Sequence, residues 1–237
     1  MTAIILTPFS LLLTALSKPH IFFLSGLGAD HRAFDRIKRD GYEQTHLPWI
    51  EPEWKDNMHS YAQKMAEPIV KAKNPVVIGL SLGGMLASEM TTFIPDMRAI
   101  LVSSIKSHEE RSNLLKLGRL FPVQHLMPPN TMQRFTFMWE MAQKKRLNGA
   151  EKHMIQMFKE QNDKFLRWAI IHAPKWRGKG DESRITHIHG TKDRMFPSRR
   201  IKNFIPVHGG THMMVYVKGE EVTELIKKEL KRIESVE

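Results

Sequence analysis

Short apolar runs recur along this chain from Pro19 onward, and segments with the spacing of amphipathic helices separate most of them. An apolar run of this length, bounded by Gly, Pro or polar residues, is typical of a strand buried on both faces. Strands that alternate with helices predict βαβ units and a parallel sheet. We expect an α/β fold with about six strands, at residues 20–25, 43–47, 76–78, 98–103, 185–189 and 204–207.

The alternation stops for about eighty residues after the fourth strand. Residues 105–180 have helix-period patterns without a clear strand, and Pro128 and Pro129 split the segment. Elsewhere we expect a helix capped by Asp30 and helices over 59–73, 83–94 and 220–233. The predicted organisation is therefore a tail over 1–18, a core over 19–104 and 181–237, and a helical insertion over 105–180.

The positive charge is concentrated in that insertion. The 237 residues carry a formal charge of +11, of which residues 104–180, with 15 basic and 6 acidic residues, contribute +9. Such a block is typical of a solvated face, or it could steer an anionic substrate or meet an anionic surface. No RNA-recognition aromatic motif or zinc finger accompanies it, so no nucleic-acid partner is expected. The chain has no cysteine, which excludes disulfides and thiolate metal sites.

The N-terminal apolar run over residues 4–16 has three readings. It is broken by Pro8, is too short to span a membrane, and has no Lys or Arg before it. A weak export signal, an irregular strand and an upstream tail all remain open. We favour a tail on a cytoplasmic protein.

A candidate nucleophile, Ser81, lies in Gly79-Leu80-Ser81-Leu82-Gly83, between the third strand and the next helix. In a G-x-S-x-G turn the serine sits on a sharp, strained bend, and the glycines allow backbone to pass close on either side. The helix that follows directs amide N–H groups at developing negative charge. The context predicts a catalytic serine.

A base and an orienting acid follow in the last third of the chain. Asp193 lies in the loop after the fifth strand and His212 in the loop after the sixth, where ligands bind in open α/β sheets. A serine hydroxyl needs both groups to act as a nucleophile. Asp96 precedes the fourth strand and falls at the wrong edge, whereas Glu109 stays open as a rival acid.

Two further histidines, His187 and His189, lie on the fifth strand. We expect them to face opposite sides of it. We predict no metal site, because no carboxylate or third histidine is suitably placed beside them.

The loop after the first strand, Ser25-Gly26-Leu27-Gly28, could supply an oxyanion hole. The Leu82 amide would be one donor and the Leu27 amide the second. A dinucleotide site is excluded because the third glycine and the later acidic residue of its motif are missing.

Together these motifs resemble the α/β-hydrolase family, in particular small cap-bearing serine esterases and lipase-like hydrolases, over residues 19–237. The resemblance implies a mostly parallel sheet with the first two family strands reduced or missing, and a helical cap at 105–180. It also implies a Ser81–His212–Asp193 triad that cleaves an ester-type bond of a small or acyl substrate without cofactor or metal. Phe135, Trp139 and Trp168 could line an acyl pocket.

Other chemistry occurs on the same triad in this family, including thioester, lactone and C–C bond cleavage. A non-catalytic binding protein on the same fold is a further alternative. The sequence departs from the family in its first oxyanion loop, which begins with Ser25-Gly26 where His-Gly is common.

Overall fold

The computed structural model describes residues 18–37, 41–113, 115–116 and 149–236. Residues 1–17 of the expected tail over 1–18, and the middle of the predicted insertion, including Pro128 and Pro129, lie outside the described residues.

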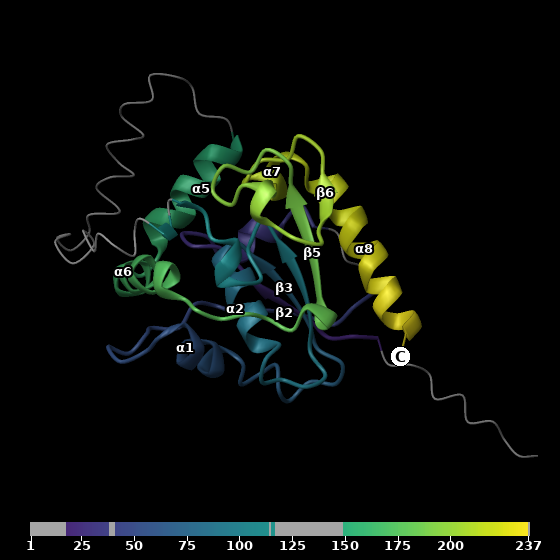
Figure 1. The fold of residues 1–237 in the computed structure, drawn as a ribbon, viewed down its shortest axis with the longest axis horizontal. Coiled ribbons are helices and arrows are strands. Elements are labelled where there is room, and N and C mark those ends of the chain that lie inside the picture. Colours follow the sequence, from purple (N-terminus) through teal and green to yellow (C-terminus); the bar gives the residue numbers. More distant parts are fainter. Residues whose placement is uncertain (1–17, 38–40, 114, 117–148, 237) are drawn as a thin grey trace, which may run out of the picture.

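The described chain forms a six-stranded, wholly parallel sheet in the order β2-β1-β3-β4-β5-β6 (Figure 1). This confirms all six predicted strands. Their bounds are Ile21–Leu24 for β1, Gln44–His46 for β2, Val76–Leu80 for β3, Arg98–Val102 for β4, Ile185–Gly190 for β5 and Ile205–Val207 for β6.

Alternate strand residues enter two separate hydrophobic cores, one on each face of the sheet. Phe22 and Val77 belong to the core under α1 (Met58–Met65) and α2 (Leu82–Met90), while Phe23 and Ile78 belong to the core under α8 (Gly219–Val236). Figure 1 shows α8 along one side of β5 and α2 across the sheet from it. Burial on both faces explains why the central strands β1, β3 and β4 are continuous apolar runs.

Three of the predicted helices are shorter than expected. α2 ends at Met90, four residues before the predicted end. α1 ends at Met65, eight residues before the predicted end, and the chain continues in turns. Pro68 is the physical reason, because it has no amide hydrogen and disfavours helical backbone at the residue before it. Asp30 does cap a helix, through the Arg32 amide, but the helix is a short 3-10 turn at His31–Phe34.

The described ends of the predicted insertion meet beside the core. The Gly180 amide donates to the Lys106 carbonyl at 2.9 Å, and the His108 amide donates to the Gly178 carbonyl at 3.0 Å. Between them lie α5 (Gly149–Glu160) and α6 (Asp163–His172). In Figure 1, α5 lies at the sheet edge where β5 ends, beside α7 (Met214–Val217).

No helix in the described ranges is long and apolar enough to cross a membrane.

Candidate active site

Ser81 occupies the sharp turn between β3 and α2, with φ of +51° and ψ of −112°. This backbone region is costly for a residue with a Cβ and is found mostly at functional sites. The hydroxyl of Ser104, just after β4, donates to the Ser81 carbonyl at 2.6 Å. The surrounding strands therefore hold a turn that local preferences alone would not adopt.

The glycines around Ser81 are required by close backbone contacts. A Cβ on Gly79 would lie 2.6 Å from the Gly84 Cα, and one on Gly83 would lie 2.2 Å from the Leu24 carbonyl oxygen. Both contacts are with backbone, which cannot rotate away. The expectation that glycines let backbone pass close on either side of the serine is confirmed at both positions.

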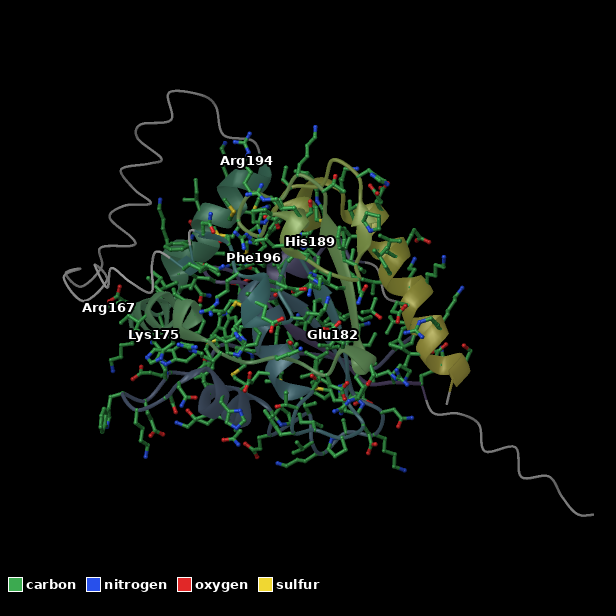
Figure 2. All side chains as sticks on the ribbon, viewed as in Figure 1. Arg167, Lys175, Glu182, His189, Arg194 and Phe196 are labelled. Carbon is green, nitrogen blue, oxygen red and sulfur yellow. The ribbon has the colours of Figure 1, made fainter. Side chains whose placement is uncertain are left out.

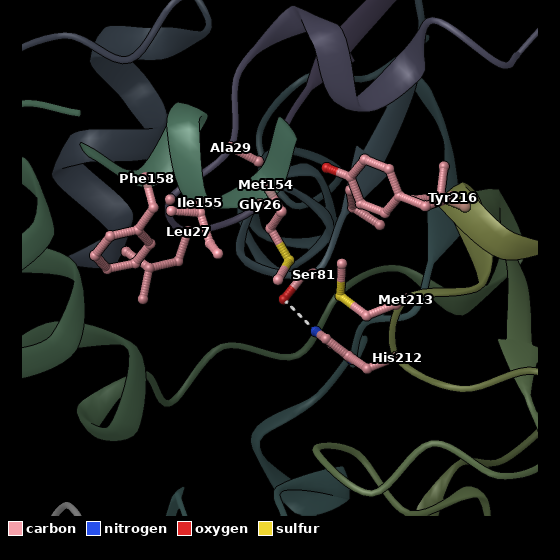
Figure 3. Close-up of a pocket in the computed structure, with 13 residues that line it drawn as sticks. Gly26, Leu27, Ala29, Ser81, Met154, Ile155, Phe158, His212, Met213 and Tyr216 are labelled. Carbon is pink, nitrogen blue, oxygen red and sulfur yellow. Dashed lines mark hydrogen bonds between the residues drawn. The ribbon is translucent and has the colours of Figure 1, made fainter. Parts of the chain in front are cut away.

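The structure brings Ser81, His212 and Asp193 into one hydrogen-bonded chain. His212 Nε2 lies 3.1 Å from Ser81 Oγ (Figure 3), and His212 Nδ1 lies 2.8 Å from Asp193 Oδ2. Glu109, the rival acid, is exposed in the 3-10 turn at His108–Glu110. Asp96 is exposed in the turn before β4.

Asp193 is buried, with 4% of its surface exposed, and its carboxylate is held on both sides. Oδ1 accepts the amides of Met195 and Phe196 at 2.8 and 2.9 Å, while Oδ2 faces His212. Burial by itself would raise the pKa of the Asp193 carboxyl, but the hydrogen bond and charge of His212 and the Phe196 amide bring this pKa below its ordinary value. The group is an ionised acceptor that fixes the imidazole ring with Nδ1 as its donor.

Two backbone amides near Ser81 are left without partners. Within the part of the chain that the structure describes, neither the Leu27 nor the Leu82 amide donates a hydrogen bond. The two segments lie close together, because the Gly83 amide donates to the Ser25 carbonyl at 3.0 Å and a Cβ on Gly26 would lie 3.4 Å from the Ser81 Cβ. Free amides beside a nucleophile can donate hydrogen bonds to an oxyanion and so stabilise its negative charge.

The Leu27 loop is anchored by three donors on a single carbonyl, that of Ala29. The Ser25 hydroxyl, the Trp49 indole and the Gln161 amide lie 2.8, 3.1 and 3.3 Å from its oxygen. Gln161 directly follows α5, so this end of the insertion contacts the loop. The contacts of Trp49 and Gln161 were not predicted, because nothing in the sequence marks these residues as neighbours of Ala29.

A cavity of about 340 Å³ opens beside Ser81 and His212 (Figure 3). Its other walls come from the Leu27 loop, from α5 and from α7. The helix α7 was not predicted from the sequence, because a single helical turn is too short for a periodic pattern. The lining residues are Gly26, Leu27, Gly28, Ala29, Leu80, Ser81, Met154, Ile155, Phe158, His212, Met213, Val215 and Tyr216.

The aromatic residues that were expected to line an acyl pocket lie elsewhere. Trp168 is buried against Tyr61 of α1, and its indole N–H donates to the Asp56 carbonyl at 2.9 Å, so it does not line the cavity at Ser81. Phe135 and Trp139 lie outside the described residues. Among the described insertion residues, Phe158 of α5 is the aromatic ring that reaches the cavity.

His187 and His189 lie on the same face of β5, contrary to expectation. Their ring centroids are 5.0 Å apart, because residues two apart on a strand point the same way. His189 Nε2 donates to the Phe196 carbonyl at 2.8 Å, and Figure 2 labels His189 and Phe196. In the described ranges, no group of three or more His, Asp or Glu side chains is arranged to hold a metal ion.

No protein-family model matches the sequence, and no curated protein matches it. Solved structures do match the fold. A thermophilic esterase from Thermogutta terrifontis is 14% identical, with 91% of this chain and 90% of that chain covered at a TM-score of 0.68.

Two further structures are similar over almost their whole lengths. An esterase from Exiguobacterium antarcticum is 15% identical, with coverage of 91% and 92% and a TM-score of 0.64. MenH from S. aureus is 16% identical, with coverage of 92% and 95% and a TM-score of 0.65. Together with the all-parallel sheet and the turn at Ser81, these likenesses show that the chain has the α/β-hydrolase fold.

Proposed function

We propose that this protein is a serine hydrolase that cleaves an ester-type bond of an acyl substrate through Ser81, His212 and Asp193. The observation that carries the proposal is the hydrogen-bonded chain from Asp193 through His212 to Ser81, which ends at an open cavity. The strained turn at Ser81 and the unpartnered amides beside it support the same function.

In the proposed mechanism, His212 Nε2 takes the Ser81 proton while Oγ attacks the substrate carbonyl. The Leu27 and Leu82 amides stabilise the oxyanion of the tetrahedral intermediate. The imidazolium then protonates the leaving group, which departs and leaves an acyl-enzyme. His212 next activates a water molecule that releases the acid. Asp193 orients the ring and stabilises its cation throughout.

The lining of the cavity favours an acyl group as the part of the substrate that binds there. Apart from Ser81, His212 and Tyr216, its side chains are apolar, and apolar pockets with few polar groups are typical ligand sites. We further propose that residues 105–180 act as a cap that shapes substrate access, since Met154, Ile155 and Phe158 of α5 supply one wall.

Covalent labelling tests the proposal most directly. A fluorophosphonate probe followed by mass spectrometry should place the label on Ser81, and Ser81→Ala should abolish both labelling and hydrolysis of p-nitrophenyl esters. Ser183→Ala, at an exposed serine remote from the cavity, is the matched control and should keep both.

A label on another residue, or hydrolysis retained by Ser81→Ala, would overturn the assignment. An unlabelled folded protein would favour a binding protein on this fold. Parallel assays with thioesters and lactones decide which bond is cleaved.

A further inference from the structure

One polar side chain in the cavity takes no part in the proposed mechanism. Tyr216 comes from α7, and 9% of its surface is exposed. Its ring lines the same cavity as Ser81 and His212, with the hydroxyl directed inward toward the side of Ala29 and Met154 (Figure 3). The Arg36 guanidinium donates to the Tyr216 backbone carbonyl at 2.6 Å, so the residue is held in place from behind.

The Tyr216 hydroxyl has no hydrogen-bonding partner among the residues that the structure describes. Buried tyrosines usually find one. Tyr61 in this chain does so, because its hydroxyl donates to the Ile50 carbonyl at 2.7 Å. The hydroxyl of Tyr61 therefore takes part in a hydrogen bond within the fold, whereas the hydroxyl of Tyr216 is available to a ligand in the cavity.

The surroundings of this hydroxyl restrict what it can bind. Burial, together with the negative charges of Asp30 and Asp35, raises the pKa of Tyr216 to about 12, so the phenol stays protonated and can donate or accept. The rest of the wall away from Ser81 and His212 is apolar. A neutral oxygen on an otherwise apolar chain matches this environment.

We infer that the Tyr216 hydroxyl is a specificity-determining hydrogen-bond site for a neutral oxygen, a hydroxyl or a carbonyl, carried by the acyl part of the substrate. The inference rests on the proposed function and narrows its substrate class from plain acyl groups to oxygenated ones. When a substrate without this oxygen binds, the Tyr216 hydroxyl is left without a hydrogen-bond partner, and the site therefore discriminates against that substrate.

A matched series of covalent probes tests this inference. One is a p-nitrophenyl alkylphosphonate with a plain medium-length chain, and the others carry a single keto or hydroxyl group moved stepwise along that chain. The measured quantity is the ratio of labelling rates at Ser81. For one position of the oxygen we expect wild type to prefer the oxygenated probe about 10-fold, which corresponds to one hydrogen bond.

Tyr216→Phe should bring this ratio to about 1 because only the hydroxyl is removed. It should also keep its thermal midpoint, since the hydroxyl has no partner to lose. Tyr61→Phe is the control: its midpoint should fall and its ratio should stay at the wild-type value. A ratio of 1 for every probe in wild type, or the same ratio in Tyr216→Phe, would overturn the inference while labelling of Ser81 still upheld the proposed function.

If no probe labels Ser81, the proposed function fails and the tyrosine is tested by equilibrium binding. Displacement of an apolar fluorescent dye from Ser81→Ala by plain and keto methyl esters of equal length gives the two affinities. A preference for the keto ester that Tyr216→Phe removes supports the site, and equal affinities reject it.

Discussion

Asp193 Oδ2 lies 2.8 Å from His212 Nδ1, while the opposite oxygen of the same carboxylate accepts two backbone amides in the turn that follows β5. The acid is therefore fixed independently of the histidine that it orients. Since the carboxylate cannot rotate away, the imidazole has one ring orientation and one tautomer available in which Nε2 faces Ser81.

Asp193→Asn should keep the fold and lose most of the activity. Asparagine can still accept the two amides through its carbonyl oxygen, but its NH₂ group then faces Nδ1 and favours the wrong histidine tautomer. We expect kcat for a p-nitrophenyl ester to fall about 10⁴-fold with little change in KM. The control is Asp96→Asn, at an exposed turn remote from the cavity, which should retain wild-type kcat. Comparable kcat values for the two variants would contradict the assigned role.

Gly28→Ala should disturb the oxyanion loop. Gly28 has φ of +73°, and an added Cβ would lie 2.0 Å from the Phe158 ring of α5. The backbone strain costs about 1–2 kcal/mol of unfolding free energy, and displacement of the ring adds to it. We also expect kcat/KM to fall, because the Leu27 amide lies next to the shifted residue. Chemical unfolding and steady-state kinetics measure the two effects.

Gly209→Ala is the matched control for this substitution. Gly209 has a similar φ of +70°, but a Cβ there would meet nothing within 4 Å. Gly209→Ala should lose unfolding free energy through backbone strain but keep its kcat/KM. Gly28→Ala combined with Phe158→Ala should regain part of the activity that Gly28→Ala alone loses. Equal kinetics for the two glycine variants would mean that the Phe158 contact does not position the loop.

Stability should fall on mild acidification because two buried histidines are held neutral. Burial, with nearby positive charge, keeps the pKa of His187 well below its ordinary value, and burial also lowers the pKa of His189. A histidine whose pKa is lower in the folded state stabilises the fold fully above its unfolded pKa, about 6.5, and loses this contribution as the pH falls. Urea unfolding should show a loss of up to about 1.4 kcal/mol per pH unit per histidine below that value.

His187→Leu should flatten this pH dependence, since the His187 ring is buried and leucine does not titrate. His208→Leu, at an exposed position, should leave it unchanged. If both variants keep the wild-type slope, the acid sensitivity has another origin.

Anionic esters should react faster at low salt. Lys192 and Arg194 line an open cavity that also contains His212, and residues 104–180 add a formal charge of +9. Their combined field should raise kcat/KM for an anionic ester, and this advantage should shrink as ionic strength rises. The double variant Lys192→Ala/Arg194→Ala should lose part of it. A neutral ester of the same acyl length is the reference. If the ratio of kcat/KM for the two esters does not change with ionic strength, the positive charge belongs to a solvated face that does not steer substrate.

Much of the fold could be predicted because its signals are local. The central strands β1, β3 and β4 are continuous apolar runs, and Gly79 and Gly83 mark the turn at Ser81 within five residues. The order of Ser81, Asp193 and His212 follows from placing each after a strand of one parallel sheet, since the carboxyl ends of such strands meet at one edge. The predicted end of α1 was wrong because the apolar spacing continues past Pro68, whereas this proline ends the helix.

The walls of the cavity were decided by tertiary structure alone. Trp168 is a large aromatic residue, as expected for a pocket, but it packs against Tyr61. Tyr216, on a single helical turn, lines the cavity beside Ser81. The Ala29 carbonyl accepts hydrogen bonds from residues as distant in the sequence as Gln161. Periodicity reports which face of an element is buried, but which remote side chain meets that face depends on how the elements pack. The parallel sheet and the candidate reacting groups can therefore be predicted from local patterns in the sequence. The side chains that surround these groups depend on how the helices and strands pack.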